Sequence, residues 1–167
     1  LLYPWKKRLY LVLTKRTPGV LFHQGQISFP GGRQDRGESL QQTALREAQE
    51  ELMIDPGKIK ILGELTPLYI PPSNYCIYPI VAATDRRPDF QASSHEVAEI
   101  IEVPVGHLLD PQNIHRETWM IRGVEIDVPF YFFKGHKIWG ATAMVLAELV
   151  ELLKKSFKAL ILPIQTR

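Results

Sequence analysis

Cysteine is almost absent from this sequence, because Cys76 is the single one among 167 residues. No disulfide can therefore form within the chain. A lone cysteine is typical of proteins kept in a reducing compartment, so we expect a cytoplasmic protein in which Cys76 is a small buried side chain. The chain begins at Leu1 rather than at a methionine, so we expect further residues upstream, where a targeting signal would not be visible.

Charge of one sign does not dominate either, because 20 Lys and Arg stand against 18 Asp and Glu. This balance gives no electrostatic reason to expect nucleic-acid binding. The longest apolar stretch, residues 143–153, is interrupted by Glu148 and Glu151, so we expect no membrane span. The five histidines are scattered, which argues against a structural zinc site. The length and the 45% of hydrophobic residues fit one domain over residues 1–167.

Hydrophobic periodicity predicts a series of strands and two helices. A capping box, Ser39 with Gln42, marks the start of the first helix, which ends near Met53. An amphipathic pattern predicts the second helix over residues 141–153. Strands are predicted over residues 9–13, 26–29, 59–65, 75–82, 99–103, 119–121 and 124–128, the last two as a hairpin. This order predicts an α/β fold in which a mixed sheet is covered by helices.

Three carboxylates crowd one side of the first predicted helix. At roughly 100° per residue, Glu47, Glu50 and Glu51 fall within about 100° of one another on its surface. Like charges at such positions repel, and a hard divalent cation with oxygen ligands relieves that repulsion. The alternative is a solvated acidic face on which Arg46 merely pairs with Glu50. The helix alone does not decide between the two interpretations.

The segment around this helix resembles the Nudix box, G-x5-E-x7-R-E-U-x-E-E-x-G-U, in which U is a bulky aliphatic residue. The matching residues are Gly32, Glu38, Arg46, Glu47, Glu50, Glu51 and Ile54. Two residues depart from the pattern, since Ala48 is small for its position and Met53 replaces a glycine. The resemblance implies a Nudix-type α/β/α sandwich with a mixed sheet and a catalytic loop-helix-loop.

The same resemblance implies a chemistry, because Nudix enzymes hydrolyse a nucleoside diphosphate linked to a further moiety and use Mg²⁺ or Mn²⁺. The implied metal ligands are the backbone carbonyl of Gly31 and the carboxylates of Glu47, Glu50 and Glu51. Arg46 would orient these glutamates, and Glu38 would brace the loop. Glu96 is placed like a residue that other members supply as an extra ligand or base, and Glu99 and Glu102 compete for that role.

A second motif upstream bears on the substrate. Residues 12–17, Gly25 and residues 29–32 resemble the motif L-L-T-x-R-S/A-x3-R-x3-G-x3-F-P-G-G of coenzyme A pyrophosphatases, and residues 138–143 are similar to their I-W-G-x-T-A stretch. Thr17 replaces a serine or alanine, and Leu21 replaces an arginine that suits phosphate recognition. Lys15, Arg33 or Arg36 could compensate. The implied substrate-binding residues are Lys15, Arg16, Gly31, Gly32 and Arg33.

These resemblances predict an enzyme that cleaves coenzyme A or an acyl-coenzyme A into 4′-phosphopantetheine and 3′,5′-ADP. Two alternatives stay open. One is a Nudix pyrophosphatase for another nucleotide, such as ADP-ribose or a dinucleoside polyphosphate. The other is a Nudix-fold binding or regulatory domain without turnover. We expect a small-molecule nucleotide partner, no nucleic acid and no membrane, and the oligomeric state is open, with a homodimer as one alternative.

Overall fold

The central element of the computed structural model, which describes residues 1–17, 25–92, 95–121 and 123–161, is a six-stranded mixed sheet. Its strands are β1 (Leu2–Trp5), β2 (Arg8–Arg16), β3 (Ile27–Ser28), β4 (Lys60–Glu64), β7 (Ile80–Ala83) and β8 (Val97–Pro104). β1 and β7 run parallel, and the other pairs are antiparallel. β2 is the central strand, because it pairs with β8 on one side and with both β1 and β3 on the other.

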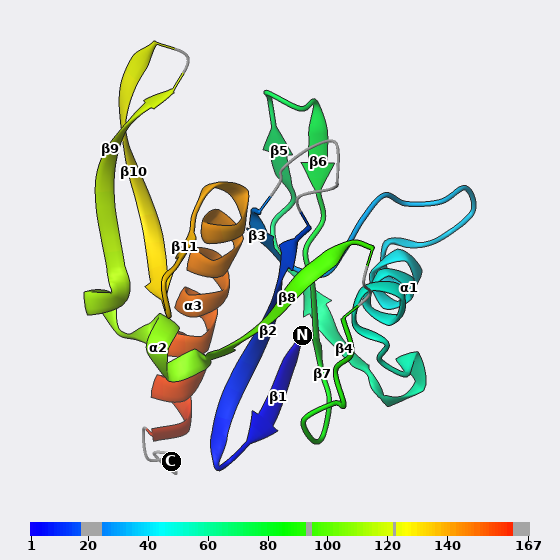
Figure 1. The fold of residues 1–167 in the computed structure, drawn as a ribbon. Coiled ribbons are helices and arrows are strands. Elements are labelled where there is room, and N and C mark those ends of the chain that lie inside the picture. Colours follow the sequence, from blue (N-terminus) through cyan, green and yellow to red (C-terminus); the bar gives the residue numbers. More distant parts are fainter. Residues whose placement is uncertain (18–24, 93–94, 122, 162–167) are drawn as a thin grey trace, which may run out of the picture.

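Two helices cover opposite faces of this sheet: α1 (Leu40–Leu52) and α3 (Gly140–Ile161) (Figure 1). The alternation of side chains along β2 explains the two layers. Val12 packs with Leu52 on the α1 face, whereas Leu11 and Leu13 pack with Leu146 on the α3 face. The predicted α/β/α sandwich with a mixed sheet is therefore confirmed.

Smaller elements surround this frame. A three-stranded antiparallel sheet consists of β9 (Ile114–Ile121), β10 (Val124–Phe133) and β11 (His136–Ile138), and the β9–β10 hairpin extends away from the body (Figure 1). A separate hairpin is formed by β5 (Leu68–Ile70) and β6 (Tyr75–Ile77). The short helix α2 (Val105–Leu109) and two 3-10 turns, η1 (Pro56–Lys58) and η2 (Pro111–Asn113), complete the described chain.

Helix α1 begins and ends where the sequence predicts. The Ser39 hydroxyl accepts a hydrogen bond from the Gln42 backbone N–H at 3.2 Å, and the Gln42 side chain accepts one from the Ser39 N–H at 2.7 Å. Met53 ends the helix in the left-handed conformation, with φ of 56°. A glycine adopts this conformation without strain, so Met53 keeps the geometry of the glycine that it replaces at a cost of roughly 1–2 kcal/mol.

The strands predicted at residues 9–13, 26–29, 59–65 and 99–103 are confirmed, as are the hairpin and the second helix, which continues to Ile161. Residues 75–82 were predicted as one strand and form two, β6 and β7, because Pro79 between them has no N–H to donate. The prediction of a buried Cys76 is wrong: its side chain is exposed on β6, in a two-stranded sheet too small to bury both faces. The pattern also missed β1, β5, β11 and α2, which are short.

The two remaining sequence features at the second helix are structural contacts. Trp139 packs edge-on against Trp119, with ring centroids 4.9 Å apart. The Thr142 hydroxyl donates to the carbonyl of Ile27 at 2.9 Å, so it ties the start of α3 to β3. Within the described residues, no helix is both long and apolar enough to cross a membrane.

Candidate active site

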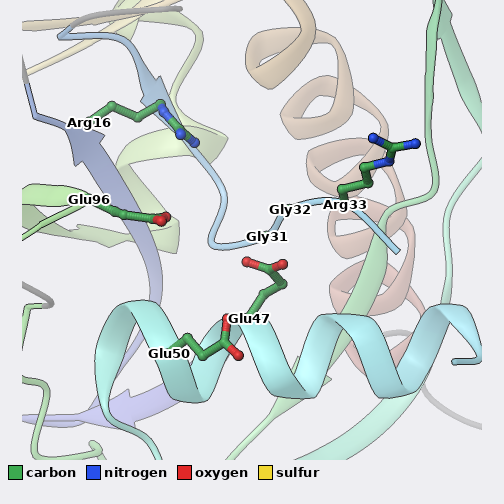
Figure 2. A pocket seen from close by; sticks show the side chains of 7 residues that line it. All are labelled: Arg16, Gly31, Gly32, Arg33, Glu47, Glu50 and Glu96. Atoms are coloured by element: carbon green, nitrogen blue, oxygen red, sulfur yellow. The ribbon is translucent and has the colours of Figure 1, made fainter. Parts of the chain in front are cut away.

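A cavity of about 310 Å³ opens between α1, the loop that precedes it and the end of β2 (Figure 2). Its lining residues are Arg16, Gly31, Gly32, Arg33, Glu47, Glu50 and Glu96. These residues come from four separate segments of the chain: the end of β2, the loop before α1, α1 itself and the turn before β8. Each was predicted as a site residue, so the fold brings together most of the predicted set.

The loop lies directly against the helix at Gly32. A Cβ atom built at this position would collide with the carboxylate of Glu47. A larger residue here would therefore displace the Glu47 carboxylate from its present position. The close approach explains why a glycine stands at this position of the motif.

Arg46 joins the loop to the helix. Its Nε donates to Glu38 Oε1 at 2.8 Å, and its Nη1 donates to Glu47 Oε1 at 2.8 Å and to Glu50 Oε2 at 3.0 Å. Its Nη2 donates to the backbone carbonyl of Arg33 at 3.0 Å. One guanidinium thus fixes two helix carboxylates and the loop backbone at the same time.

Glu38 holds the loop from its other end. Its carboxylate accepts hydrogen bonds from Arg46, from the Thr43 hydroxyl at 2.8 Å and from the Asp35 N–H at 3.1 Å. These bonds, with Arg46 as the strongest influence, lower the pKa of Glu38 to about 2. Thr43 was not predicted as a site residue. The only signal in the sequence is that it lies on α1 one turn before Glu47, where a hydroxyl can reach back to the loop.

Glu51 differs from the other carboxylates of the site in its burial and in the partners of its oxygen atoms. Its side chain is only 4% exposed, and its Oε2 has no hydrogen-bond partner among the described residues. Burial, followed by the neighbouring charge of Glu47, raises the pKa of Glu51 to about 7, although Arg16 and the Gly31 amide oppose this rise. Burial also raises the pKa of Glu47. A buried carboxylate without a partner is costly, and a cation would satisfy it.

These observations test whether the residues fit a divalent cation. The described side chains do not already form a set of three converging ligands, and the contacts supply a reason, because Arg46 Nη1 bonds both Glu47 and Glu50. The implied donors are all oxygen atoms, three carboxylates and one backbone carbonyl, and Mg²⁺ and Mn²⁺ prefer oxygen ligands. The carboxylates of the site outnumber the arginine side chains that contact them. The Oε2 atom of Glu51 has no hydrogen-bond partner among the described residues. The residues fit a divalent cation.

Glu96 lines the cavity, and its two predicted competitors do not. The Thr17 N–H donates to the Glu96 carbonyl at 3.0 Å, so the end of β2 holds the turn that carries Glu96. Glu99 instead contacts Lys15 and His136. Glu102 accepts two hydrogen bonds from Arg87, each of 2.7 Å.

Lys15 does not line the cavity, although the sequence predicts a substrate contact there. Lys15 lies 3.9 Å from Glu99 instead, and the pairing of β2 with β8 shifts register between Lys15 and Arg16. Arg16 is half-buried and its Nε has no partner among the described residues. Leu21, where the motif has an arginine, lies outside the described residues.

Comparisons with known proteins show the family and the fold. A family model described as the NUDIX domain matches residues 2–122. A protein of Photorhabdus laumondii named "Uncharacterized Nudix hydrolase NudL" is 37% identical over 147 residues, which cover 87% of this chain and 78% of that protein. Its namesake in Yersinia pestis is 34% identical over 142 residues, covering 84% and 71%. The crystal structure of RenU, a Nudix hydrolase from M. smegmatis, superposes with a TM-score of 0.60 at 15% identity and covers 96% of this chain and 81% of that one, which shows a shared fold.

Proposed function

The chain belongs to the Nudix hydrolase family, and from that premise we propose that it hydrolyses the pyrophosphate bond of coenzyme A or an acyl-coenzyme A. The products are 3′,5′-ADP and 4′-phosphopantetheine. The observation that carries the proposal is the position of Arg16 in the T-x-R motif. This residue reaches the same cavity as the Gly31-Gly32 pair of the F-P-G-G motif, and its Nε has no partner among the described residues. A guanidinium placed this way suits a phosphate oxygen of the substrate.

Glu47, Glu50 and Glu51, with the carbonyl of Gly31, would hold Mg²⁺ or Mn²⁺. When bound, such a cation would supply charge neutralisation for the pyrophosphate and would lower the pKa of a water molecule. Glu47 and Glu50 already line the cavity, and the buried Glu51 Oε2 has no partner among the described residues. Arg46 also bonds Glu38 and the carbonyl of Arg33, so it would hold the loop in place beside such a cation.

The chain's own residues would perform the remaining steps. Arg16 binds and orients the pyrophosphate. A water molecule attacks one phosphorus, the bond from that phosphorus to the bridging oxygen breaks, and the electron pair leaves with the other phosphate. Glu96 or Glu47 accepts the proton of the water, since both carboxylates line the cavity.

A specific observation keeps a second function in view. Leu21 cannot supply the phosphate contact of the arginine that it replaces, which favours a nucleotide without a third phosphate, such as ADP-ribose. A non-catalytic binding domain is the weaker alternative. The carboxylates and the arginine that turnover needs are all present in the Nudix box.

A substrate panel tests the proposal. Coenzyme A, acetyl-coenzyme A, ADP-ribose and diadenosine tetraphosphate are incubated with Mg²⁺ or Mn²⁺, and the products are identified by mass spectrometry. We expect coenzyme A to give a higher kcat/KM than ADP-ribose. A clear preference for ADP-ribose would reject the coenzyme A assignment, and no metal-dependent turnover of any compound would indicate a binding domain.

A further inference from the structure

We infer that Arg33 is the residue that recognises a phosphomonoester of the substrate outside the scissile pyrophosphate. The inference rests on the proposed function, because coenzyme A carries such a group at its 3′-position. The sequence raises the question, since Leu21 replaces the arginine of the motif and leaves this phosphate without its expected contact. Lys15, Arg33 and Arg36 are the basic residues that could replace it, and the structure separates them.

Only one of the three lines the cavity. Lys15 does not line the cavity and lies 3.9 Å from Glu99. Arg36 is exposed on the same loop as Arg33 but does not contribute to the cavity wall. Arg33 lines the cavity and forms none of the ion pairs found within the described residues.

The direction of the Arg33 side chain separates its role from that of Arg16. In Figure 2, Arg16 and Arg33 stand on opposite sides of the Glu47 carboxylate, and the guanidinium of Arg33 points away from both Glu47 and Glu50. A group that sits on the glutamates would therefore not meet this guanidinium. Arg33 is placed for an anionic group beyond the bond that is cleaved.

The backbone of Arg33 is fixed even though its side chain is exposed. Its carbonyl accepts a hydrogen bond from Arg46 Nη2 at 3.0 Å, and the next residue, Gln34, donates to the Glu38 carbonyl at 2.6 Å. A side chain on a fixed backbone loses less freedom when it binds. A guanidinium can bind a phosphomonoester through two parallel hydrogen bonds. The Arg33 side chain therefore suits a dianionic phosphate group.

The experiment compares coenzyme A with 3′-dephospho-coenzyme A in three proteins: the wild type, Arg33→Gln and Arg36→Gln. The two variants lose the same charge from the same loop, so overall electrostatics cannot distinguish them. We expect the wild type to prefer coenzyme A in kcat/KM. Arg33→Gln should reduce that preference about ten- to a hundredfold, which is the size of one charged phosphate contact, and Arg36→Gln should leave it within about twofold.

A binding measurement without turnover provides a second readout. Isothermal titration calorimetry with 3′,5′-ADP and 5′-AMP, in the absence of metal, should show the same loss of discrimination in Arg33→Gln and not in Arg36→Gln. An undiminished preference in Arg33→Gln, an equal loss in both variants, or a wild type without preference would overturn the inference while coenzyme A hydrolysis stands. A wild type that hydrolyses ADP-ribose but neither coenzyme A compound would instead reject the proposed function, and the inference with it.

Discussion

The clusters that Arg87 and Arg46 form with carboxylates differ in their balance of charge. Arg87 binds a single carboxylate, Glu102, through two hydrogen bonds of 2.7 Å, and Tyr3 donates a third at 2.6 Å. The guanidinium also lies over the Trp5 and Phe90 rings, at 5.3 Å from each centroid. Here one cation neutralises one anion, and two aromatic rings lie against the guanidinium.

The cluster at Arg46 is not balanced. One guanidinium contacts Glu38, Glu47 and Glu50, and Glu51 lies nearby with a buried oxygen that has no partner among the described residues. The pKa values show the contrast. Burial raises the pKa of Glu51 to about 7, whereas for Glu102 the bonds from Arg87 and Tyr3 outweigh burial and lower it. The comparison teaches that a structural ion pair is complete within the protein, whereas the site leaves an excess of negative charge for a ligand to neutralise.

The largest expected difference between the two clusters comes from neutralising one carboxylate in each. We expect Glu51→Gln to lower kcat/KM by roughly 10³-fold, because an amide is a poor ligand for Mg²⁺ and a bound metal contributes several kcal/mol. Glu102→Gln should leave kcat within about threefold and instead lower the free energy of unfolding by about 1–3 kcal/mol. Steady-state kinetics and thermal unfolding of both variants test this, and an active Glu51→Gln would reject the metal assignment.

The next largest effect identifies which carboxylate accepts the proton of the attacking water. A side-chain base contributes roughly 10²–10⁴-fold to proton transfer, so we expect an alanine variant of either Glu47 or Glu96 to lose about a hundredfold in kcat. The variants are compared at matched metal occupancy, determined by a titration for each one. Small and equal losses would mean that the attacking water needs no side-chain base.

Of the two clusters, only the one at Arg46 could be predicted in part from the sequence. The spacing of Glu47, Glu50 and Glu51 on a helix follows from local geometry, so the acidic side of α1 could be predicted without a structure. The interpretation that Arg46 merely pairs with Glu50 was correct as a contact, yet incomplete. It missed Glu38 and the loop carbonyl, which only the folded loop brings within reach.

The Arg87 cluster could not be predicted, because its members come from strands and a loop far apart in the sequence. Tyr3 lies on β1, a strand that the hydrophobic pattern missed, and Glu102 enters the sequence analysis only as a candidate extra ligand or base. The same limit applies to Lys15 and Arg16. Their adjacency in the sequence suggests a shared role, and only the folded cavity shows that Arg16 lines it and Lys15 does not. Local patterns define the elements, whereas the contacts between distant elements require the fold.

The contributions of Glu51 and Glu102 to the pH dependence of stability should differ in sign. The pKa of Glu51 is raised in the folded state to about 7, so between about pH 4.5 and 7 the folded protein binds more protons than the unfolded one. Without metal, stability should therefore fall as the pH rises through this window, by roughly 2–3 kcal/mol. The lowered pKa of Glu102 acts in the opposite direction, since its contribution is present at neutral pH and is lost on acidification.

Chemical denaturation of the metal-free protein at pH 5 and pH 8 measures this effect. Glu51→Gln should remove most of the decrease in the free energy of unfolding between the two pH values. In the wild type, added Mg²⁺ should reverse this decrease by binding the ionised carboxylate. The wild type and the variant would have the same pH profile if Glu51 had an ordinary pKa. That result would contradict the interpretation that the site holds an excess of negative charge.

The smallest expected effect comes from one hydroxyl in each cluster. Tyr3 donates to Glu102 at 2.6 Å and Thr43 donates to Glu38 at 2.8 Å, and both side chains are buried. Tyr3→Phe and Thr43→Val each remove one hydrogen bond to a carboxylate, so we expect both to lower the free energy of unfolding by about 1–2 kcal/mol. Only Thr43→Val should also lower kcat, by a few-fold, because Glu38 holds the arginine that orients the catalytic carboxylates. Thr43→Ser keeps the hydroxyl and should restore kcat, whereas a lower kcat in Tyr3→Phe would show that the two clusters are coupled and that the comparison fails.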